Sequence, residues 1–281
     1  HDQRQEDGGA LVFDSDPLQE QMEILGAAEV ELTLTSNQPL AMVAVRLSNV
    51  APDQKVTRVT YCPLNLTHRI SRQHPEHLVP GERYCVRVRL NEIAQVFPVG
   101  HRIRLAISTS YLPLAWPSPR PVRLTILAGL SELVLPVRPP SKLDSELREF
   151  GPPEGAEPTP RRYLEPGHHN WIIHRDLATD ESTLEVINDN GIVKLEEIDL
   201  EVENRALEWY TLRGDDFLSL KGETHLTRGL RRGDWSVRTV AHTVLTSSAT
   251  SFRIRADLDA FEGDTRVFSR NWDVSIPRDF V

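Results

Sequence analysis

Segments in which every second residue is apolar recur along most of this 281-residue chain. The clearest is His101–Ser108, where Ile103, Leu105 and Ile107 alternate with Arg102, Arg104 and Ser108. Because successive side chains of a β-strand point to opposite faces of a sheet, this pattern predicts a strand with one buried face. Similar short segments follow one another along the chain, separated by turn residues, and no segment shows the pattern of a long amphipathic helix. The sequence therefore predicts an all-β protein that begins with a sandwich of two packed sheets.

The segment at 101–108 leads into a proline-rich loop, residues 111–121, with the sequence YLPLAWPSPRP. Proline has no N–H to donate and fixes φ, so this loop must leave the sheet as a stiff, extended segment. A stiff loop that carries large apolar side chains is suited to contacting a substrate or another domain, although its tryptophan can equally cap the core. The candidate substrate-cleft or domain-interface residues are Tyr111, Leu112 and Trp116.

Two β regions and a linker are predicted along the chain. Residues 1–137 are expected to form a jelly-roll β-sandwich. Residues 138–162 are dense in proline and charge, which is typical of a semi-rigid linker. Residues 163–281 are predicted to form a second antiparallel β-meander domain, as a curved sheet or a partial barrel. Within it, Asn190-Gly191 is expected to be the two-residue turn of a β-hairpin.

Charge and cysteine content narrow the partners and the location. A formal net charge of −9 and a pI near 5.6 argue against binding to nucleic acid or to an anionic membrane. No apolar run is long enough to cross a bilayer, and residues 1–10 do not resemble a signal peptide. Cys62 and Cys85 are expected to be buried, reduced thiols. We therefore expect a cytoplasmic protein.

No catalytic motif is found in the chain. The G-x-S-x-G pattern of a nucleophile elbow, the P-loop and the dinucleotide fingerprint do not occur. His242, Ser247 and Asp257 can be combined on paper into a triad, but the turn-like sequence around Ser247 makes chance the better explanation. No catalytic residue is predicted.

Two segments carry residue types that bind metal ions. His68, His74 and His77 share one loop, but their spacing fits no zinc template, and a solvated polar loop explains them better. Val186–Glu197 approximates the offsets of an EF-hand, yet it begins with valine and is flanked by predicted strands, so a hairpin turn is the better interpretation. No metal and no cofactor are predicted.

Several long runs carry a resemblance to a known family, among them LVFDSDPLQEQMEILGAAEVELTLTSNQP, VTYCPLNLTHR and HPEHLVPGERYCVRVRLNEIAQVFPVGHRIRLAISTSYLPLAWPSP. Over about residues 2–140 the chain resembles the C-terminal region of X-Pro dipeptidyl-peptidase and cocaine-esterase-like (CocE/NonD) serine hydrolases. The remainder, including GDWSVRTVAHTVLTSS and FEGDTRVFSRNW, resembles a C-terminal extension found in a bacterial subgroup. The resemblance implies a galactose-binding-like jelly roll that follows an N-terminal α/β-hydrolase domain. In the family that N-terminal domain holds the catalytic Ser, Asp and His, so the resemblance assigns no catalytic residue here.

These observations predict a non-catalytic accessory region of a serine hydrolase of the X-Pro dipeptidyl-peptidase or acyl ester/amide hydrolase type. It is expected to stabilise the catalytic domain and to help wall the substrate cleft, and the chain alone is expected to be inactive. The alternative is a carbohydrate-binding or adhesion β-sandwich module. The expected partners are the chain's own N-terminal hydrolase domain and a second copy, which would contact an exposed docking surface that includes the 111–119 loop.

Overall fold

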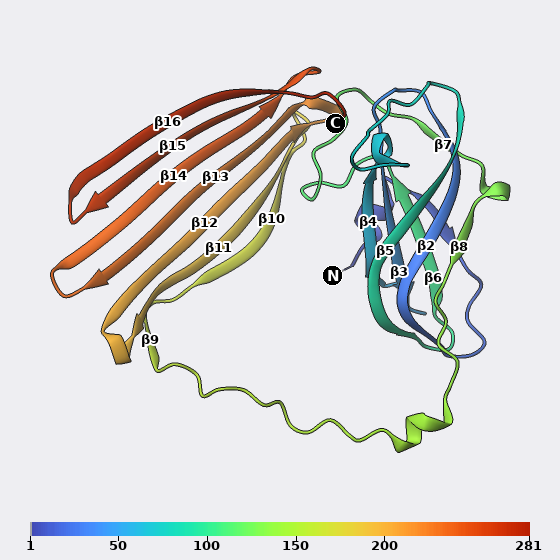
Figure 1. Cartoon of the computed structure of the whole chain (residues 1–281), viewed down its shortest axis with the longest axis horizontal. Coiled ribbons are helices and arrows are strands. Elements are labelled where there is room, and N and C mark those ends of the chain that lie inside the picture. The colour runs from blue at the N-terminus through green and yellow to red at the C-terminus, as the bar shows by residue number, and fades with distance from the viewer. Residues whose placement is uncertain (1) are drawn as a thin grey trace. The chain divides into compact units, whose positions relative to one another are not determined.

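The computed structural model describes residues 2–281 and divides the chain into two compact units (Figure 1). Unit 1 comprises His1–Glu149 together with Phe280–Val281, and unit 2 comprises Phe150–Asp279. The predicted all-β class is confirmed, because strands make up both units. Within residues 2–281 no helix has the length and hydrophobicity needed to span a membrane. The helical elements are short: α1 (Arg4–Asp7), η1 (Leu66–His68), η2 (Ala128–Leu130), η3 (Lys142–Glu146) and η4 (Glu196–Ile198).

Unit 1 is a sandwich of two four-stranded sheets, and all of its strand pairs are antiparallel. One sheet has the order β1-β6-β3-β4. In the other, β2 lies between β5 on one side and β7 and β8 on the other. The eight strands are β1 (Leu11–Asp14), β2 (Met22–Ser36), β3 (Met42–Val50), β4 (Val56–Asn65), β5 (Arg83–Phe97), β6 (Arg102–Ser108), β7 (Leu124–Ile126) and β8 (Glu132–Val134).

The core of unit 1 lies between these two sheets and contains the apolar face of β6 that the alternation predicted. Strand β3 is covered on both faces. Its side chains Val43, Val45 and Leu47 enter the core, while Arg46 on the opposite face is also buried. This second face is covered because Asp7, at the end of α1, forms an ion pair with Arg46. A buried arginine requires such a partner, since an unpaired buried charge is strongly destabilising.

Unit 2 is one antiparallel sheet in which each strand from β10 to β16 pairs with the next, and Figure 1 shows it as a curved, open sheet. The predicted meander is confirmed, and its curved form is the one observed: β10 lies at one edge and β16 at the other. The short β9 pairs with β11 beyond the end of β10. The strands are β9 (Arg161–Glu165), β10 (His168–Asp176), β11 (Glu181–Leu195), β12 (Leu200–Arg213), β13 (Asp216–Arg232), β14 (Trp235–Ser247), β15 (Ser251–Glu262) and β16 (Thr265–Pro277).

The two faces of the unit 2 sheet differ in character. In β15, Phe252 and Ile254 point to one face, and Arg253 points to the other. Among residues 2–281, the buried hydrophobic side chains belong to unit 1 except for Val186 and Leu220. The apolar face of the sheet therefore keeps large side chains exposed to solvent. They include Trp171, Ile173, Phe268, Val274 and Ile276.

The predicted hairpin turn at Asn190-Gly191 is wrong. Strand β11 continues through these residues, with a bulge in its pairing between Asp189 and Ile192. Gly191 has φ of +66°, which explains the Asn-Gly sequence, because a bulge can need a left-handed residue as much as a turn does. A Cβ atom at Gly191 would lie 2.2 Å from the carbonyl oxygen of Glu165, so the backbone at the end of β9 also requires glycine here.

Candidate functional site

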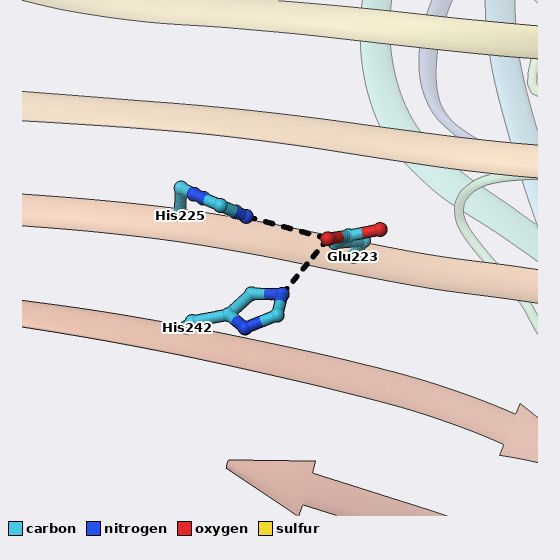
Figure 2. Close-up of side chains that lie close together, drawn as sticks. All are labelled: Glu223, His225 and His242. Carbon is cyan, nitrogen blue, oxygen red and sulfur yellow. Dashed lines mark hydrogen bonds and ion pairs between the residues drawn. The ribbon is translucent and has the colours of Figure 1, made fainter. Parts of the chain in front are cut away.

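Three potential metal ligands converge on the polar face of the unit 2 sheet (Figure 2). Glu223 and His225 are two residues apart on β13 and therefore share a face, and His242 on β14 is paired directly with His225. The Nε2 atom of His242 lies 2.8 Å from Oε1 of Glu223, and the Nε2 atom of His225 lies 3.3 Å from the same oxygen. One carboxylate oxygen thus faces two imidazole nitrogens.

The second oxygen of Glu223 has a different partner. The ammonium of Lys221 lies 2.7 Å from Oε2 of Glu223, which leaves Oε1 to the histidines. The hydrogen bond from Lys221, together with those from His242 and His225, lowers the pKa of Glu223 to about 2 against the opposing effect of burial. Glu223 is therefore a carboxylate at neutral pH.

Neighbouring side chains hold the two imidazole rings. The rings of His225 and His242 are 4.3 Å apart between centroids, and the ring of Trp209 packs edge-on against His225 at 5.3 Å. A carboxylate oxygen of Asp257, the residue paired with His242 on β15, lies 3.9 Å from Nδ1 of that histidine. The carboxylate of Glu223 therefore lies beside both imidazole rings, and that of Asp257 lies beside His242. The two strands that carry the cluster, β13 and β14, are flanked by β12 and β15.

The structure separates the residues of the paper triad. His242 and Asp257 are paired across β14 and β15 and share the polar face of the sheet. Ser247 is paired with Phe252, five positions after His242 in a strand without a bulge, so its side chain points to the opposite face. Because the serine and the histidine lie on different faces, these three residues do not form a nucleophilic triad.

The candidate residues of the proline-rich loop have unequal exposure. Tyr111 is buried: its hydroxyl accepts a hydrogen bond from Arg58, and its ring packs edge-on against Tyr61 at 5.5 Å. Leu112 and Trp116 are partly exposed. The loop therefore anchors itself to unit 1 through Tyr111 and presents the other two side chains at its surface.

The two metal candidates considered from the sequence are not brought together as ligand sets. In the described chain the three-residue cluster at β13 and β14 is the group whose donor atoms meet, and it includes none of the loop histidines. Of those, His77 stacks on Phe280 with ring centroids 4.8 Å apart. The segment Val186–Glu197 lies mostly within β11 and pairs with β12, so it is not a calcium loop.

Unit 1 also has a cleft of about 320 Å³ at the margin of its core. Its lining is mostly apolar, with a few polar groups, and comes from both sheets. The residues that contribute include Leu32, Leu105 and Leu133, along with Asp14 and Ser15. A cleft of this kind suits an apolar group better than a sugar, which needs several converging hydrogen-bond partners.

Sequence reasoning missed the cluster, although it named His242 and Asp257 for another purpose. The Glu-x-His spacing at 223–225 does place two donors on one face of a strand. That spacing is common on solvent-facing strands and carries little specificity alone. The third donor is 17 residues beyond His225, and only the register of β13 against β14 brings it opposite.

The fold and the site together define a class of protein: an all-β region in which His242, Ser247 and Asp257 do not form a triad. Residues 1–146 match the family model described as the X-Pro dipeptidyl-peptidase C-terminal non-catalytic domain, and the chain belongs to this family. No curated protein matches the chain in sequence.

Several solved structures are similar to part of the chain. An α-amino acid ester hydrolase has 24% identity and a TM-score of 0.47, and the similarity covers 49% of this chain and 27% of that protein. An aminopeptidase from a marine sediment archaeon, Thaumarchaeota archaeon, has 19% identity, the same TM-score and the same coverage. A CocE/NonD family hydrolase from Staphylococcus aureus has 11% identity and a TM-score of 0.40, covering 46% of this chain and 30% of that one. The chain therefore spans less than a third of the length of these proteins.

Proposed function

We propose that this chain is the accessory C-terminal region of a cytoplasmic bacterial serine hydrolase, of the X-Pro dipeptidyl-peptidase or acyl ester/amide hydrolase type. Its partner in this proposal is an α/β-hydrolase domain that precedes it in the same protein and supplies the nucleophile. The observation that carries the proposal is the match of residues 1–146 to the non-catalytic domain family. The sandwich, which we assign to the galactose-binding-like class, would stabilise the catalytic domain. The expected burial of both thiols is wrong, since Cys85 is exposed and Cys62 is partly buried, but both are free, which suits a reducing compartment.

The proline-rich loop is the part of unit 1 that we propose as a wall of the substrate cleft. Leu112 and Trp116 are partly exposed, and Tyr111 fixes the base of the loop through Arg58. A loop anchored in this way presents its surface side chains without a large entropic cost on binding.

The test uses the full-length hydrolase with Leu112→Ala and Trp116→Ala combined, so that the anchor Tyr111 is left in place. We expect kcat/KM for the preferred substrate to fall about tenfold or more, because lost apolar contacts of this size cost one or more kcal/mol. Leu130→Ala is the matched control, since Leu130 is an exposed leucine elsewhere in unit 1. Unchanged kcat/KM and thermal midpoint in the double variant would contradict both the cleft role and the stabilising role of this loop.

We also propose that the separate chain self-associates, with the contact on the apolar face of the unit 2 sheet in place of the 111–119 loop that the sequence analysis expected. Large exposed apolar patches on soluble proteins are sites of association. In light scattering coupled to size exclusion, Val274→Asp is expected to shift the chain towards monomer. Val240→Asp is the control, because Val240 has similar exposure, 37% against 42%, on the opposite face. A clean monomer for the unmodified chain would contradict this part of the proposal.

The carbohydrate-binding alternative makes a different prediction for the same protein. It requires a polar, aromatic-lined site, whereas the cleft of unit 1 is mostly apolar. We expect calorimetric titration of the chain with a panel of glycans to give no specific heat. Saturable binding of one glycan would favour the alternative over the accessory role.

A further inference from the structure

We propose that Glu223, His225 and His242 form a binding site for a divalent transition-metal ion of the zinc type. The proposed accessory role of the chain does not require such a site, and the two proposals can fail separately. The donors are two imidazole nitrogens and one carboxylate oxygen, all within 4.8 Å of one another. Figure 2 shows both rings directed at the same carboxylate from two neighbouring strands.

The distances between the donor atoms suit a small metal ion. Bonds of about 2.0–2.2 Å in a tetrahedral zinc site place neighbouring ligand atoms about 3.3 Å apart. The two imidazole nitrogens lie 2.8 Å and 3.3 Å from Oε1 of Glu223. An ion can therefore replace the hydrogen bonds of this cluster through small side-chain rotations, without a change in the backbone of β13 or β14.

The chemistry of the donors selects the type of ion. Imidazole nitrogen favours zinc, copper and nickel, whereas magnesium and calcium prefer oxygen donors alone. Because Lys221 occupies the Oε2 atom of Glu223, Oε1 is the oxygen that faces the ring nitrogens. The side chains of His225 and His242 are 50% and 37% exposed, so solvent can reach the ion. Three protein ligands leave a fourth position for water or for a small ligand.

The surroundings hold the donors in place. β13 and β14 are central strands, paired with β12 and β15 on their outer sides, so the register of the His225–His242 pair is fixed by both neighbours. Trp209 packs against His225. Asp257 can accept a hydrogen bond from Nδ1–H of His242 when Nε2 binds a metal, since Nδ1 and Oδ2 of Asp257 are 3.9 Å apart before any adjustment. Carboxylates in this position orient a histidine ligand and raise its basicity.

The same face of the sheet offers a matched pair that lacks the second imidazole. His174 on β10 lies 3.0 Å from Oε2 of Glu185 on β11, and the indole N–H of Trp209 donates to the other oxygen of Glu185. One histidine and one carboxylate give two donors, too few for a tight site. His174→Ala is therefore the control that removes an exposed histidine beside a carboxylate without touching the proposed ligands.

The test is isothermal titration of the tag-free 281-residue chain with zinc chloride, together with the visible absorption of its cobalt(II) complex. We expect one ion per chain and cobalt bands typical of nitrogen and oxygen donors in low coordination. His225→Ala, His242→Ala and Glu223→Gln are each expected to weaken zinc binding about 100-fold or more, and His174→Ala is expected to leave it unchanged. No saturable binding, or equal loss in His174→Ala, would overturn the proposal.

A second variant protects the test against misfolding. Circular dichroism checks that each variant keeps its β-sheet signal. The second variant is Asp257→Asn, which leaves all three proposed ligands in place. Loss of an outer carboxylate typically weakens metal binding about 10-fold to 100-fold. We expect a loss in this range for Asp257→Asn with an unchanged metal-free spectrum. If Asp257→Asn and the three ligand variants all bind zinc as tightly as the unmodified chain does, the ion binds elsewhere and the assignment is overturned.

Discussion

The carboxylate of Asp7 lies between two guanidinium groups in unit 1. Its Oδ1 atom is 2.9 Å from Arg46, and its Oδ2 atom is 3.1 Å from Arg104. The side chains of Asp7 and Arg46 are each 4% exposed, so this ion pair is shielded from water. Arg104 also holds Asp14 through two hydrogen bonds of 2.7 Å. A single short helical turn, α1, thus supplies the negative charge that makes a buried arginine on β3 tolerable.

Asp7→Ala is expected to lower the free energy of unfolding of unit 1 by about 3–5 kcal/mol, because it leaves Arg46 buried without its counter-charge. Urea unfolding followed by circular dichroism measures the change. Glu92→Ala is the control, since Glu92 and Arg89 form an exposed ion pair and its loss should cost less than about 1 kcal/mol. Equal effects of the two substitutions would show that burial of the Asp7 pair does not matter.

Asp14→Asn is expected to act in a pH-dependent way. The hydrogen bonds from Arg104 hold the pKa of Asp14 below its ordinary value of 3.8. A carboxyl whose pKa is lowered on folding stabilises the fold above its unfolded pKa, and this contribution disappears as the pH falls through the folded pKa. The variant should therefore be less stable than the unmodified chain by about 1 kcal/mol at pH 7. Urea midpoints between pH 7 and pH 3 should converge below about pH 4, and a constant difference would contradict this prediction.

Strand β11 shows how one element joins two partners. Its first part pairs with β10 and its last part with β9, and the bulge at Asp189–Ile192 lies at the change between them. Gly191 allows this change, because φ of +66° and the close approach of the Glu165 carbonyl both exclude a side chain. The bulge therefore links local backbone chemistry to the arrangement of three strands.

Gly191→Ala is expected to destabilise unit 2 by about 3 kcal/mol or more, since it combines left-handed strain with a backbone clash. Gly233→Ala is the matched control: its φ is +55°, but a Cβ there meets nothing within 4 Å. The control should cost about 1–2 kcal/mol, which is the strain alone. Thermal unfolding of both variants measures the difference, and equal losses would mean that the clash is relieved by movement of β9.

Two units of different construction make up the chain. Unit 1 has a core between two sheets, whereas unit 2 is a single sheet with an apolar face that stays exposed within residues 2–281. A single sheet normally requires a second layer or a partner to bury its apolar face. This requirement is why we attribute the association of the separate chain to the apolar face of unit 2.

Limited trypsin digestion is expected to cut first in the exposed segment 139–160 at the boundary of the two units, after Lys142 and Arg148. Residues 139–160 are exposed and, apart from η3, lie outside regular secondary structure, so a protease can bind them as an extended chain. Mass spectrometry of early time points should show two fragments, and Lys142→Gln combined with Arg148→Gln should delay their release. First cuts within β10 to β16 would show that the sheet of unit 2 opens more easily than the linker.

The domain boundaries 1–137, 138–162 and 163–281 stay predictions. Proline and charge density locate a region of weak packing, but they do not say which residue makes the last contact of a unit. Along the sequence, the division between the two compact units instead falls between residues 149 and 150, and Phe280–Val281 is grouped with unit 1. No pattern in the sequence shows that the last two residues belong to unit 1 although they follow unit 2 in the chain. This grouping depends on contacts such as the hydrogen bonds from Asn65 and Thr67 to the Phe280 carbonyl.

The sequence by itself determined the all-β class, the apolar faces of strands such as β6 and β15, and the family of residues 1–146, because alternation and ordered motifs are local properties of the chain. Tertiary structure decided what depends on distant pairing. In the structure Asn190-Gly191 forms a bulge and not a hairpin turn, the buried Tyr111 is hydrogen-bonded to Arg58, and His242 lies opposite His225. The physical reason is register: the identity of a cross-strand neighbour is set by how two whole strands align, and neither strand encodes that alignment alone.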